Sequence, residues 1–256
     1  MKPAEFASLN GQCAVVTGSS SGIGRAMALE FAAAGADVVL HCRQNLAAAE
    51  ELRRQIVGLG RQAEIVAADL GRECELATFV DRVWSVWNRV DIWVNNAGAD
   101  LLTGPESRLE YAKKLQTLLD VDVRATMLLS RLAGPRMRAA GGGVMLNIGW
   151  DQADRGMEGD SGELFAAAKN AIMGFSRALA LSLAPEVRVN CIAPGWIRTA
   201  WGRQAAESWQ QRVLRETPLR RWGEPEDVAA TARFLASPAA AFITGQVIAV
   251  NGGAVR

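Results

Sequence analysis

The sequence predicts an α/β fold: one doubly wound parallel sheet with helices on both faces. Short apolar segments alternate with longer amphipathic ones along nearly the whole chain, and this alternation is typical of consecutive βαβ units. The short segments have no polar face, which is expected of strands that helices cover on both sides. The links between the segments are short, as they are in such units.

Each short apolar run is predicted as a strand, and the amphipathic stretch that follows it is predicted as a helix. In chain order, the strand and helix of each unit span residues 13–16 and 22–34, 37–41 and 45–59, 64–67 and 73–88, 91–94 and 107–139, 144–148 and 162–184, and 188–191 and 225–236, before a last strand at 247–250. No internal repeat and no linker rich in Pro and Ser divides the chain. We therefore expect residues 1–256 to form one domain.

One long connection, residues 193–221, has no clear alternation. It contains Trp196, Trp201 and Trp209. In folds of this kind, a long excursion past the carboxyl end of a strand often covers a ligand. We expect a small lid at about 196–221, whose tryptophans either line an apolar pocket or pack the segment on the body. Trp84, Trp87 and Trp93 are predicted to lie in the core.

The composition excludes several classes of function. The 256 residues carry 28 Lys and Arg against 27 Asp and Glu, for a net charge of +1. Such a balance argues against nucleic acid or an anionic membrane surface as a partner, because both usually require a basic excess. No apolar stretch reaches the ~18 residues of a transmembrane helix, and no secretory signal is visible. A cytoplasmic location is expected.

Cysteine and histidine usage narrows the chemistry further. The four cysteines form no CxxC pair, which predicts buried thiols in a reducing compartment: Cys13, Cys42, Cys74 and Cys191. His41 is the single histidine, so a metal site built by the protein and a serine-histidine triad are both improbable. No metal is expected.

A glycine-rich turn follows the first strand and leads into the first helix. Glycines there permit a tight turn and aim the free N–H groups of the helix at a pyrophosphate. An ordinary strand-to-helix loop is the alternative. The predicted cofactor-binding residues of this turn are Gly18, Ser20, Ser21, Gly22, Ile23 and Gly24.

Arg43 follows the second strand, at the place where an NAD site usually has an acidic side chain. A guanidinium there suits a 2′-phosphate, which favours NADP(H), with NAD(H) as the alternative. Asp37 does not restore the NAD interpretation, because it opens the strand rather than ending it. The competing interpretation of Arg43 is a solvated residue at the start of a helix.

From about residue 9 to the C-terminus the chain resembles the short-chain dehydrogenase/reductase family, which has a Rossmann fold, and it is similar to the 3-oxoacyl-carrier-protein reductases. The motifs that carry the resemblance occur in the family's order: TGxxxGIG at 17–24, ADL at 68–70, NNAG at 95–98, APGWIRT at 193–199, PLRRWGEPED at 218–227, ITGQ at 243–246 and NGG at 251–253.

The resemblance implies roles for several residues at the carboxyl ends of strands. Asp69 and Leu70 would hold the adenine of the cofactor. Asn96, Ala97 and Gly98 would follow the adenosine ribose, although hydrogen bonding between strands is an alternative task for Asn95 and Asn96. The nicotinamide end would meet Pro194, Gly195, Ile197 and Thr199. The resemblance also implies a small-molecule substrate or ligand and a homo-oligomer, either a tetramer or a dimer.

The catalytic set of the family is altered in this chain. In the family a tyrosine delivers the proton, a lysine four residues later lowers its pKa, a serine holds the carbonyl oxygen and an asparagine organises a relay. Lys169 is kept, but Phe165 takes the place of the tyrosine, Trp150 that of the serine and Asp122 that of the asparagine. The only tyrosine, Tyr111, lies in an earlier helical region.

These changes predict that ordinary carbonyl reduction is lost, since general acid-base assistance contributes about 10²–10⁴ in rate. Two hypotheses remain: a nucleotide-binding protein without dehydrogenase activity, and an active NADP(H)-dependent oxidoreductase with another proton path. Asp122 and Lys169 would form either a partly buried ion pair or a relay through water. Glu158, Asp160 or Glu163 could replace the acid if burial raised a pKa, although a solvated loop and helix start explain them equally.

Overall fold

The computed structural model describes residues 6–103 and 105–255. Within them, seven strands form one sheet in the order β3-β2-β1-β4-β5-β6-β7, and every neighbouring pair is parallel. The strands are β1 (Cys13–Val16), β2 (Asp37–Cys42), β3 (Ala63–Ala67), β4 (Ile92–Asn95), β5 (Gly143–Ile148), β6 (Val187–Pro194) and β7 (Val247–Val250). The predicted doubly wound parallel sheet is confirmed.

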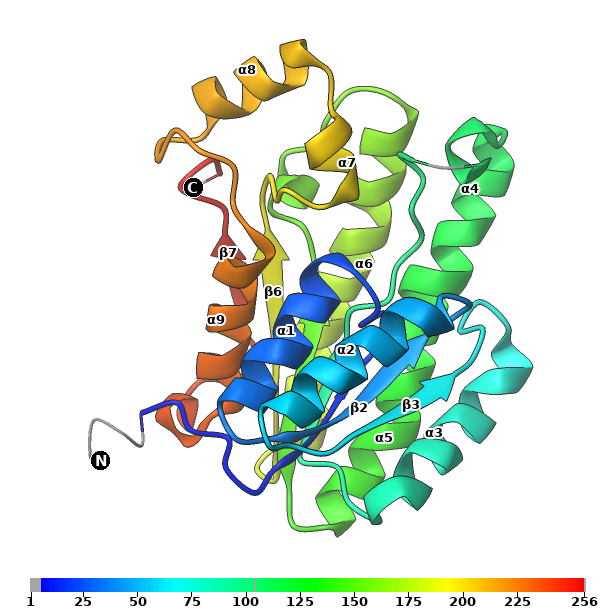
Figure 1. The fold of residues 1–256 in the computed structure, drawn as a ribbon. Coiled ribbons are helices and arrows are strands. Elements are labelled where there is room, and N and C mark those ends of the chain that lie inside the picture. The colour runs from blue at the N-terminus through cyan, green and yellow to red at the C-terminus, as the bar shows by residue number, and fades with distance from the viewer. Residues whose placement is uncertain (1–5, 104, 256) are drawn as a thin grey trace.

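Helices cover both faces of this sheet (Figure 1). The helices α1 (Gly22–Ala33), α2 (Leu46–Gly58) and α9 (Pro225–Ala236) pack on one face, and α3 (Glu73–Trp87), α5 (Ala125–Ala139) and α6 (Asp160–Leu183) pack on the other. Three further helices lie beyond the carboxyl edge or beside it: α4 (Tyr111–Leu118), α7 (Ala200–Gln204) and α8 (Glu207–Glu216).

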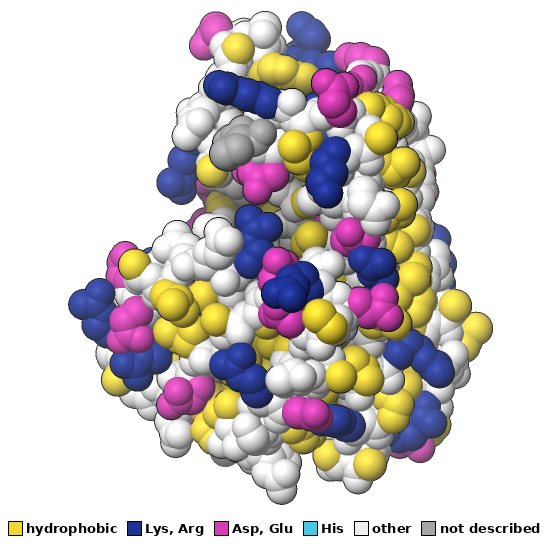
Figure 2. Space-filling model, turned by 90° about the vertical axis from the view of Figure 1, so that its right-hand side faces the viewer, with side chains coloured by type: hydrophobic (Ala, Val, Ile, Leu, Met, Phe, Trp, Pro, Cys, Tyr) yellow, Lys and Arg dark blue, Asp and Glu magenta, His cyan; other side chains and the backbone are white. Residues whose placement is uncertain are grey.

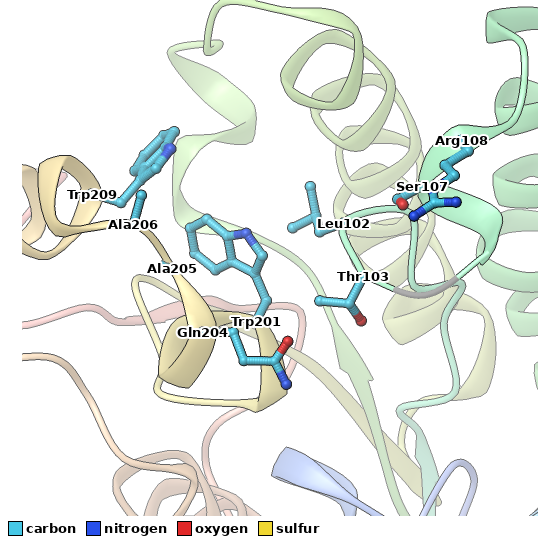
Figure 3. A pocket seen from close by; sticks show the side chains of 9 residues that line it. All are labelled: Leu102, Thr103, Ser107, Arg108, Trp201, Gln204, Ala205, Ala206 and Trp209. Carbon is cyan, nitrogen blue, oxygen red and sulfur yellow. The ribbon is translucent and has the colours of Figure 1, made fainter.

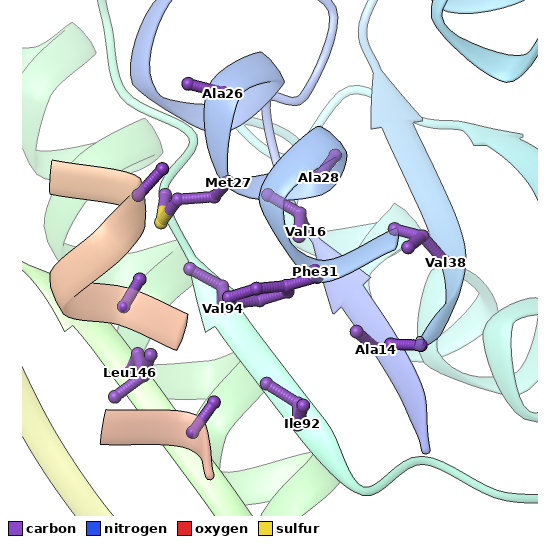
Figure 4. Packing of buried hydrophobic residues seen from close by; sticks show 14 of the residues in the cluster. Ala14, Val16, Ala26, Met27, Ala28, Phe31, Val38, Ile92, Val94 and Leu146 are labelled. Carbon is purple, nitrogen blue, oxygen red and sulfur yellow. The ribbon is translucent and has the colours of Figure 1, made fainter. Parts of the chain in front are cut away.

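Most strand residues are apolar because successive side chains enter different cores. In β1, Ala14 and Val16 pack in the core under α1, whereas Val15 belongs to the core on the opposite face. Met27 and Phe31 of α1 are fully buried in the first core (Figure 4). Burying a large apolar side chain stabilises a fold by roughly 1.5–3 kcal/mol, so both faces anchor the sheet.

The prediction of one continuous helix over 107–139 is wrong, because this stretch is divided into several helical segments. A short 3₁₀ turn, η2 (Pro105–Arg108), precedes α4, and a π-helical segment, η3 (Leu119–Arg124), separates α4 from α5. A π-helix has i→i+5 hydrogen bonds and often marks a functional position. Here it carries Asp122, which is 1% exposed. The other predicted helices and strands lie within a few residues of their expected bounds, whereas α7 and α8 lie in the connection 193–221, where no helix was predicted.

The prediction of four buried thiols is wrong for Cys74, which is exposed, while Cys13 is half-buried. Of the tryptophans predicted in the core, Trp93 is fully buried and Trp84 and Trp87 are partly buried. In the described ranges no helix is long and apolar enough to cross a membrane. Basic and acidic side chains are intermingled on the face that carries α3 and α4 (Figure 2).

Candidate functional site

The glycine-rich turn places the start of α1 at the carboxyl edge of the sheet. α1 begins at Gly22 and has no acidic residue in its first turn, so its free N–H groups and its dipole favour a phosphate. Gly18 and Gly22 have φ of 64° and 53°, a conformation that glycine adopts without strain. A Cβ on Gly24 would collide with Asn96 Nδ2 and with the Gly18 carbonyl oxygen. The turn therefore needs these glycines.

The glycine-rich turn at 17–24 and the segment 193–199 lie next to each other. A Cβ on Gly22 would lie 3.6 Å from Thr199 Cγ2, which brings the segment after β6 to the start of α1. Ser21 is exposed, and Ser20 and Ile23 are half-buried. The turn thus presents its backbone and its serines to the space beside Thr199.

Thr17 and Asn96 connect β1 to β4 at the same edge. Thr17 Oγ1 accepts hydrogen bonds from the N–H groups of Asn96 (2.9 Å) and Ala97 (3.0 Å). Asn96 Nδ2 donates to the Thr17 carbonyl oxygen over 2.9 Å. Asn95 points into the core, where its Nδ2 donates to Ser130 Oγ and Asn147 Oδ1. Both asparagines therefore form hydrogen bonds between neighbouring segments of the fold, which was the alternative interpretation of these residues.

His41 connects the glycine-rich turn to the neighbouring end of β3. Its Nδ1 accepts a hydrogen bond from the Gly18 N–H over 2.9 Å, and its Nε2 lies 3.1 Å from the Ala68 carbonyl oxygen. Burial lowers the pKa of His41 to about 4. The neutral ring fixes the glycine-rich turn to the end of β3. The only sequence signal for this role was the position of His41 near the end of β2.

The corner beyond β2 and β3 holds the residues predicted for the adenosine part of a cofactor. Arg43 follows β2 directly, and its guanidinium forms an exposed ion pair with Glu106 at 3.5 Å. Asp69 Oδ1 accepts a hydrogen bond from the Gly71 N–H over 3.0 Å. Leu70 is 3% exposed and packs in the core on the α3 side.

Asp122 and Lys169 form a direct ion pair. Lys169 Nζ lies 2.8 Å from Asp122 Oδ2, and the two side chains are 13% and 1% exposed. Lys169 Nζ also donates to the Ile148 carbonyl oxygen over 3.3 Å, and Asp122 Oδ1 accepts from the Ala99 N–H over 2.8 Å. A Cβ on Gly98 would lie 2.9 Å from Asp122 Oδ2. The π-helical turn thus joins α6, β5 and the segment after β4.

The side chains of Trp150 and Phe165 contact each other. Their ring centroids are 6.4 Å apart in an edge-to-face arrangement. Phe165 also packs with Leu101 and Ala168, and Trp150 packs with Met173. Neither ring carries an ionisable group, so this contact has no proton to deliver.

Asp151, the residue after Trp150, is a buried carboxyl group for which the sequence predicted no role. It is 5% exposed, its Oδ2 accepts from Asn251 Nδ2 over 3.1 Å, and its Oδ1 has no hydrogen-bond partner among the described residues. A Cβ on Gly195 would lie 3.1 Å from Oδ2. Burial raises the pKa of Asp151 to about 6. Its place directly after Trp150 was the only signal available in the sequence.

The other carboxylates of this segment are exposed. Glu158 forms a 2.7 Å ion pair with Arg212, and this hydrogen bond lowers the pKa of Glu158. Asp160 and Glu163 lie in the first turn of α6, and Glu163 accepts a hydrogen bond from Tyr111 Oη over 3.3 Å. Burial of these three groups, which the acid-replacement hypothesis required, is not observed.

The segment after β6 lies at the carboxyl edge of the sheet, where the predicted nicotinamide-binding residues are found. Pro194 ends β6, Ile197 is 7% exposed, and the backbone at Ile197 bridges to Gly223. The three tryptophans of the predicted lid pack with one another and with a fourth: Trp196, Trp201, Trp209 and Trp222. In the part of the chain with described placement, no group of three His, Cys, Asp or Glu could hold a metal ion.

Comparison with known proteins identifies the family. The sequence model of a family described as enoyl-(acyl carrier protein) reductase matches residues 18–255. The chain is 37% identical over 250 residues to the 7alpha-hydroxysteroid dehydrogenase of Escherichia coli (strain K12), covering 97% of this chain and 96% of that protein. It is 36% identical over 253 residues to a 3-oxoacyl-[acyl-carrier-protein] reductase of Synechocystis sp., covering 96% and 98%.

Solved structures of similar fold come from the same kinds of enzyme as the similar sequences. A 7alpha-hydroxysteroid dehydrogenase complexed with NADH and 7-oxo glycochenodeoxycholic acid superposes with a TM-score of 0.90 at 36% identity, covering 100% of this chain and 98% of that one. A putative NAD(P)-dependent gluconate 5-dehydrogenase from Beutenbergia cavernae with bound NADP superposes with a TM-score of 0.86 at 36% identity, covering 97% and 98%. This chain belongs to the short-chain dehydrogenase/reductase family of oxidoreductases.

Proposed function

We propose that this protein binds NADP(H) at the carboxyl edge of its sheet and does not perform the family's ordinary carbonyl reduction. The observation that carries the proposal is the contact of Phe165 with Trp150, with ring centroids 6.4 Å apart. Two aromatic rings occupy the positions from which the family donates a proton and holds the carbonyl oxygen.

The residues at the edge fit a dinucleotide. The glycine-rich turn leaves the N–H groups at the start of α1 free, and Gly22 faces Thr199 across the turn. A pyrophosphate satisfies such N–H groups and complements the helix dipole. A bound nicotinamide cofactor supplies or accepts a hydride. The role of the chain is to hold the cofactor between α1 and the segment after β6.

Arg43 supports NADP(H) over NAD(H). Its side chain is 51% exposed directly after β2, where a 2′-phosphate would lie, and its present partner is Glu106 at 3.5 Å. A phosphate with two charges would displace this weak ion pair, since exposed pairs contribute only about 0–1 kcal/mol. The two solved relatives hold NADH in one case and NADP in the other, so the family alone does not decide the preference.

The second candidate function is an active NADP(H)-dependent oxidoreductase, and the 2.8 Å contact between Lys169 and Asp122 favours it. A lysine beside a carboxylate, together with a water molecule, is a proton relay that needs no tyrosine. The relatives named above are dehydrogenases and a reductase. In this candidate the substrate is a small molecule with a carbonyl or hydroxyl group.

Assembly is part of the same proposal. We infer a homo-oligomer, either a tetramer or a dimer, in the cytoplasm. Leu181 of α6 is 84% exposed and Phe242, before β7, is 104% exposed, and contact with a second copy of the chain would remove this apolar surface from water. Sedimentation velocity would report a monomer if this inference is wrong.

Two measurements test the function. Tryptophan fluorescence is titrated with NADPH and with NADH, and we expect tighter saturable quenching by NADPH; no quenching by either would overturn the proposal. A panel of carbonyl compounds is then assayed at the NADPH absorbance. We expect no turnover by the wild type and measurable turnover by Phe165→Tyr combined with Trp150→Ser. Wild-type turnover that collapses in Lys169→Ala would instead establish the second candidate.

A further inference from the structure

A cleft of about 690 Å³ separates the segment after β4 from the segment after β6. Sites for small organic ligands typically enclose about 300–1,000 Å³, so the cleft has the size of a ligand site. Figure 3 shows Trp201 and Trp209 on one wall, Arg108 on the opposite wall and Leu102 between them. The walls come from segments far apart in the sequence.

The aromatic wall is rigidly supported. The rings of Trp201 and Trp209 have centroids 5.5 Å apart in an edge-to-face arrangement. Behind them lie Trp196 and Trp222, which are only 7% and 2% exposed. Because the buried rings of Trp196 and Trp222 hold the partly buried rings of Trp201 and Trp209 in place, little side-chain entropy would be lost when a flat apolar ligand binds.

The opposite wall has a cation that is not neutralised. Arg108 is exposed, and within the described ranges it forms no ion pair with a carboxylate, nor does an Asp or Glu line the cleft. The neighbouring Arg212 differs: its guanidinium lies 4.7 Å from the Trp209 ring centroid, but Glu158 and Glu216 both pair with it. Arg108 is therefore the charge that a ligand in the cleft would meet.

The cleft is connected to the candidate site through two consecutive leucines. Leu102 lines the cleft, and the preceding Leu101 is 1% exposed and packs in one cluster with Phe165. A ligand between Leu102 and Trp201 would thus have one end near the segment that contacts Phe165. The other end would face Arg108.

We propose that this cleft binds an amphipathic organic anion, with a flat apolar body against Trp201 and Trp209 and a carboxylate paired with Arg108. A guanidinium binds a carboxylate through two parallel hydrogen bonds, which selects an anion over a neutral group of equal shape. The proposal rests on the proposed function in one respect: it makes this anion the ligand that binds beside the NADP(H) cofactor.

The test compares three probes that differ only in their polar end: 4-(1-pyrenyl)butanoate, its primary amide and 4-(1-pyrenyl)butylammonium. Energy transfer from tryptophan to pyrene gives each Kd on the whole chain without cofactor. We expect the carboxylate to bind about tenfold more tightly than the amide. Raising NaCl from about 0.05 to 0.5 M should weaken the carboxylate and leave the amide unchanged.

Variants assign the preference to Arg108. Arg108→Gln should abolish the advantage of the carboxylate while the amide keeps its affinity, which also verifies that the variant is folded. Arg108→Glu should transfer the preference to the ammonium probe. Arg203→Gln is the matched control, since this exposed arginine of α7 does not line the cleft, and it should leave all three affinities unchanged.

Three results would overturn the proposal: equal binding of carboxylate and amide to the wild type, a carboxylate preference that survives in Arg108→Gln, or no binding of any probe. Because cofactor is absent from these titrations, a failure to bind NADPH in the fluorescence experiment would contradict the proposed function alone. The two failures are therefore distinguishable.

Discussion

The N–H group of Gly18 donates a hydrogen bond to Nδ1 of His41, with 2.9 Å between the two nitrogens. Nε2 of the same ring lies 3.1 Å from the carbonyl oxygen of Ala68. A carbonyl oxygen only accepts, so Nε2 carries the proton and the ring is neutral. The ring connects the glycine-rich turn to the end of β3 only while it is uncharged.

The first prediction is that acid weakens this connection. The pKa of His41 is lowered from its usual 6.5 to about 4, so the unfolded chain binds a proton below pH 6.5 that the folded chain refuses. The free energy of unfolding should therefore fall by about 3 kcal/mol through this group between pH 6.5 and 4. His41→Asn should lose that component, and urea titrations across this range measure it. Identical pH slopes for the two proteins would contradict the prediction.

The second prediction concerns Asp151 and has the opposite sign. Burial raises its pKa from 3.8 to about 6, so its contribution to stability is complete below pH 3.8 and is lost as pH rises through 6. Relative to Asp151→Asn, the wild type should lose about 3 kcal/mol of unfolding free energy between pH 4 and 8. Urea titrations of both proteins at these two pH values test it. A difference between the proteins that does not change with pH would show that the carboxyl is solvated.

The third prediction isolates the glycine-rich turn. Gly24→Ala places a Cβ against Asn96 Nδ2 and the Gly18 carbonyl oxygen, so the turn must move, and NADPH quenching should weaken at least about tenfold. Gly58→Ala is the control, because a Cβ at this last residue of α2 meets nothing within 4 Å. It should leave NADPH binding unchanged and stabilise the fold by about 0.5–1 kcal/mol. Equal NADPH affinity in both variants would exclude the turn from the cofactor site.

The sequence predicted the sheet because apolar periodicity is a local property. In β1, Ala14 and Val16 enter one core and Val15 the other, and such burial on both sides is visible as an unbroken apolar run. The π-helical turn at Asp122 was not predictable in this way. A turn with i→i+5 hydrogen bonds shifts the helical register by one residue without any distinctive composition, so the stretch 107–139 was interpreted as one helix.

Some residues of the candidate site were likewise predictable from local motifs, and others were not. The glycine-rich turn and Lys169 were predicted from motifs, and the structure places Lys169 against Asp122. The burial of Asp151 was not predictable, since it arises from Gly195 and Asn251, which approach from β6 and the C-terminal segment. The two hydrogen bonds of His41 likewise depend on the ends of three strands that meet only in the folded sheet.

The last prediction tests whether Asp122 and Lys169 act as one unit. Asp122 is 1% exposed, so Lys169→Met leaves its carboxylate buried without a cation, which should cost about 3–5 kcal/mol of unfolding free energy. In Asp122→Asn combined with Lys169→Met both charges are gone, and the loss should be smaller than in Lys169→Met alone. A double-mutant cycle completed with Asp122→Asn gives the coupling energy between the two residues from urea titrations. A coupling energy near zero would mean that each side chain is stabilised by its own backbone partner, the Ala99 N–H for Asp122 and the Ile148 carbonyl oxygen for Lys169, and the relay of the second candidate function would then lose its structural basis.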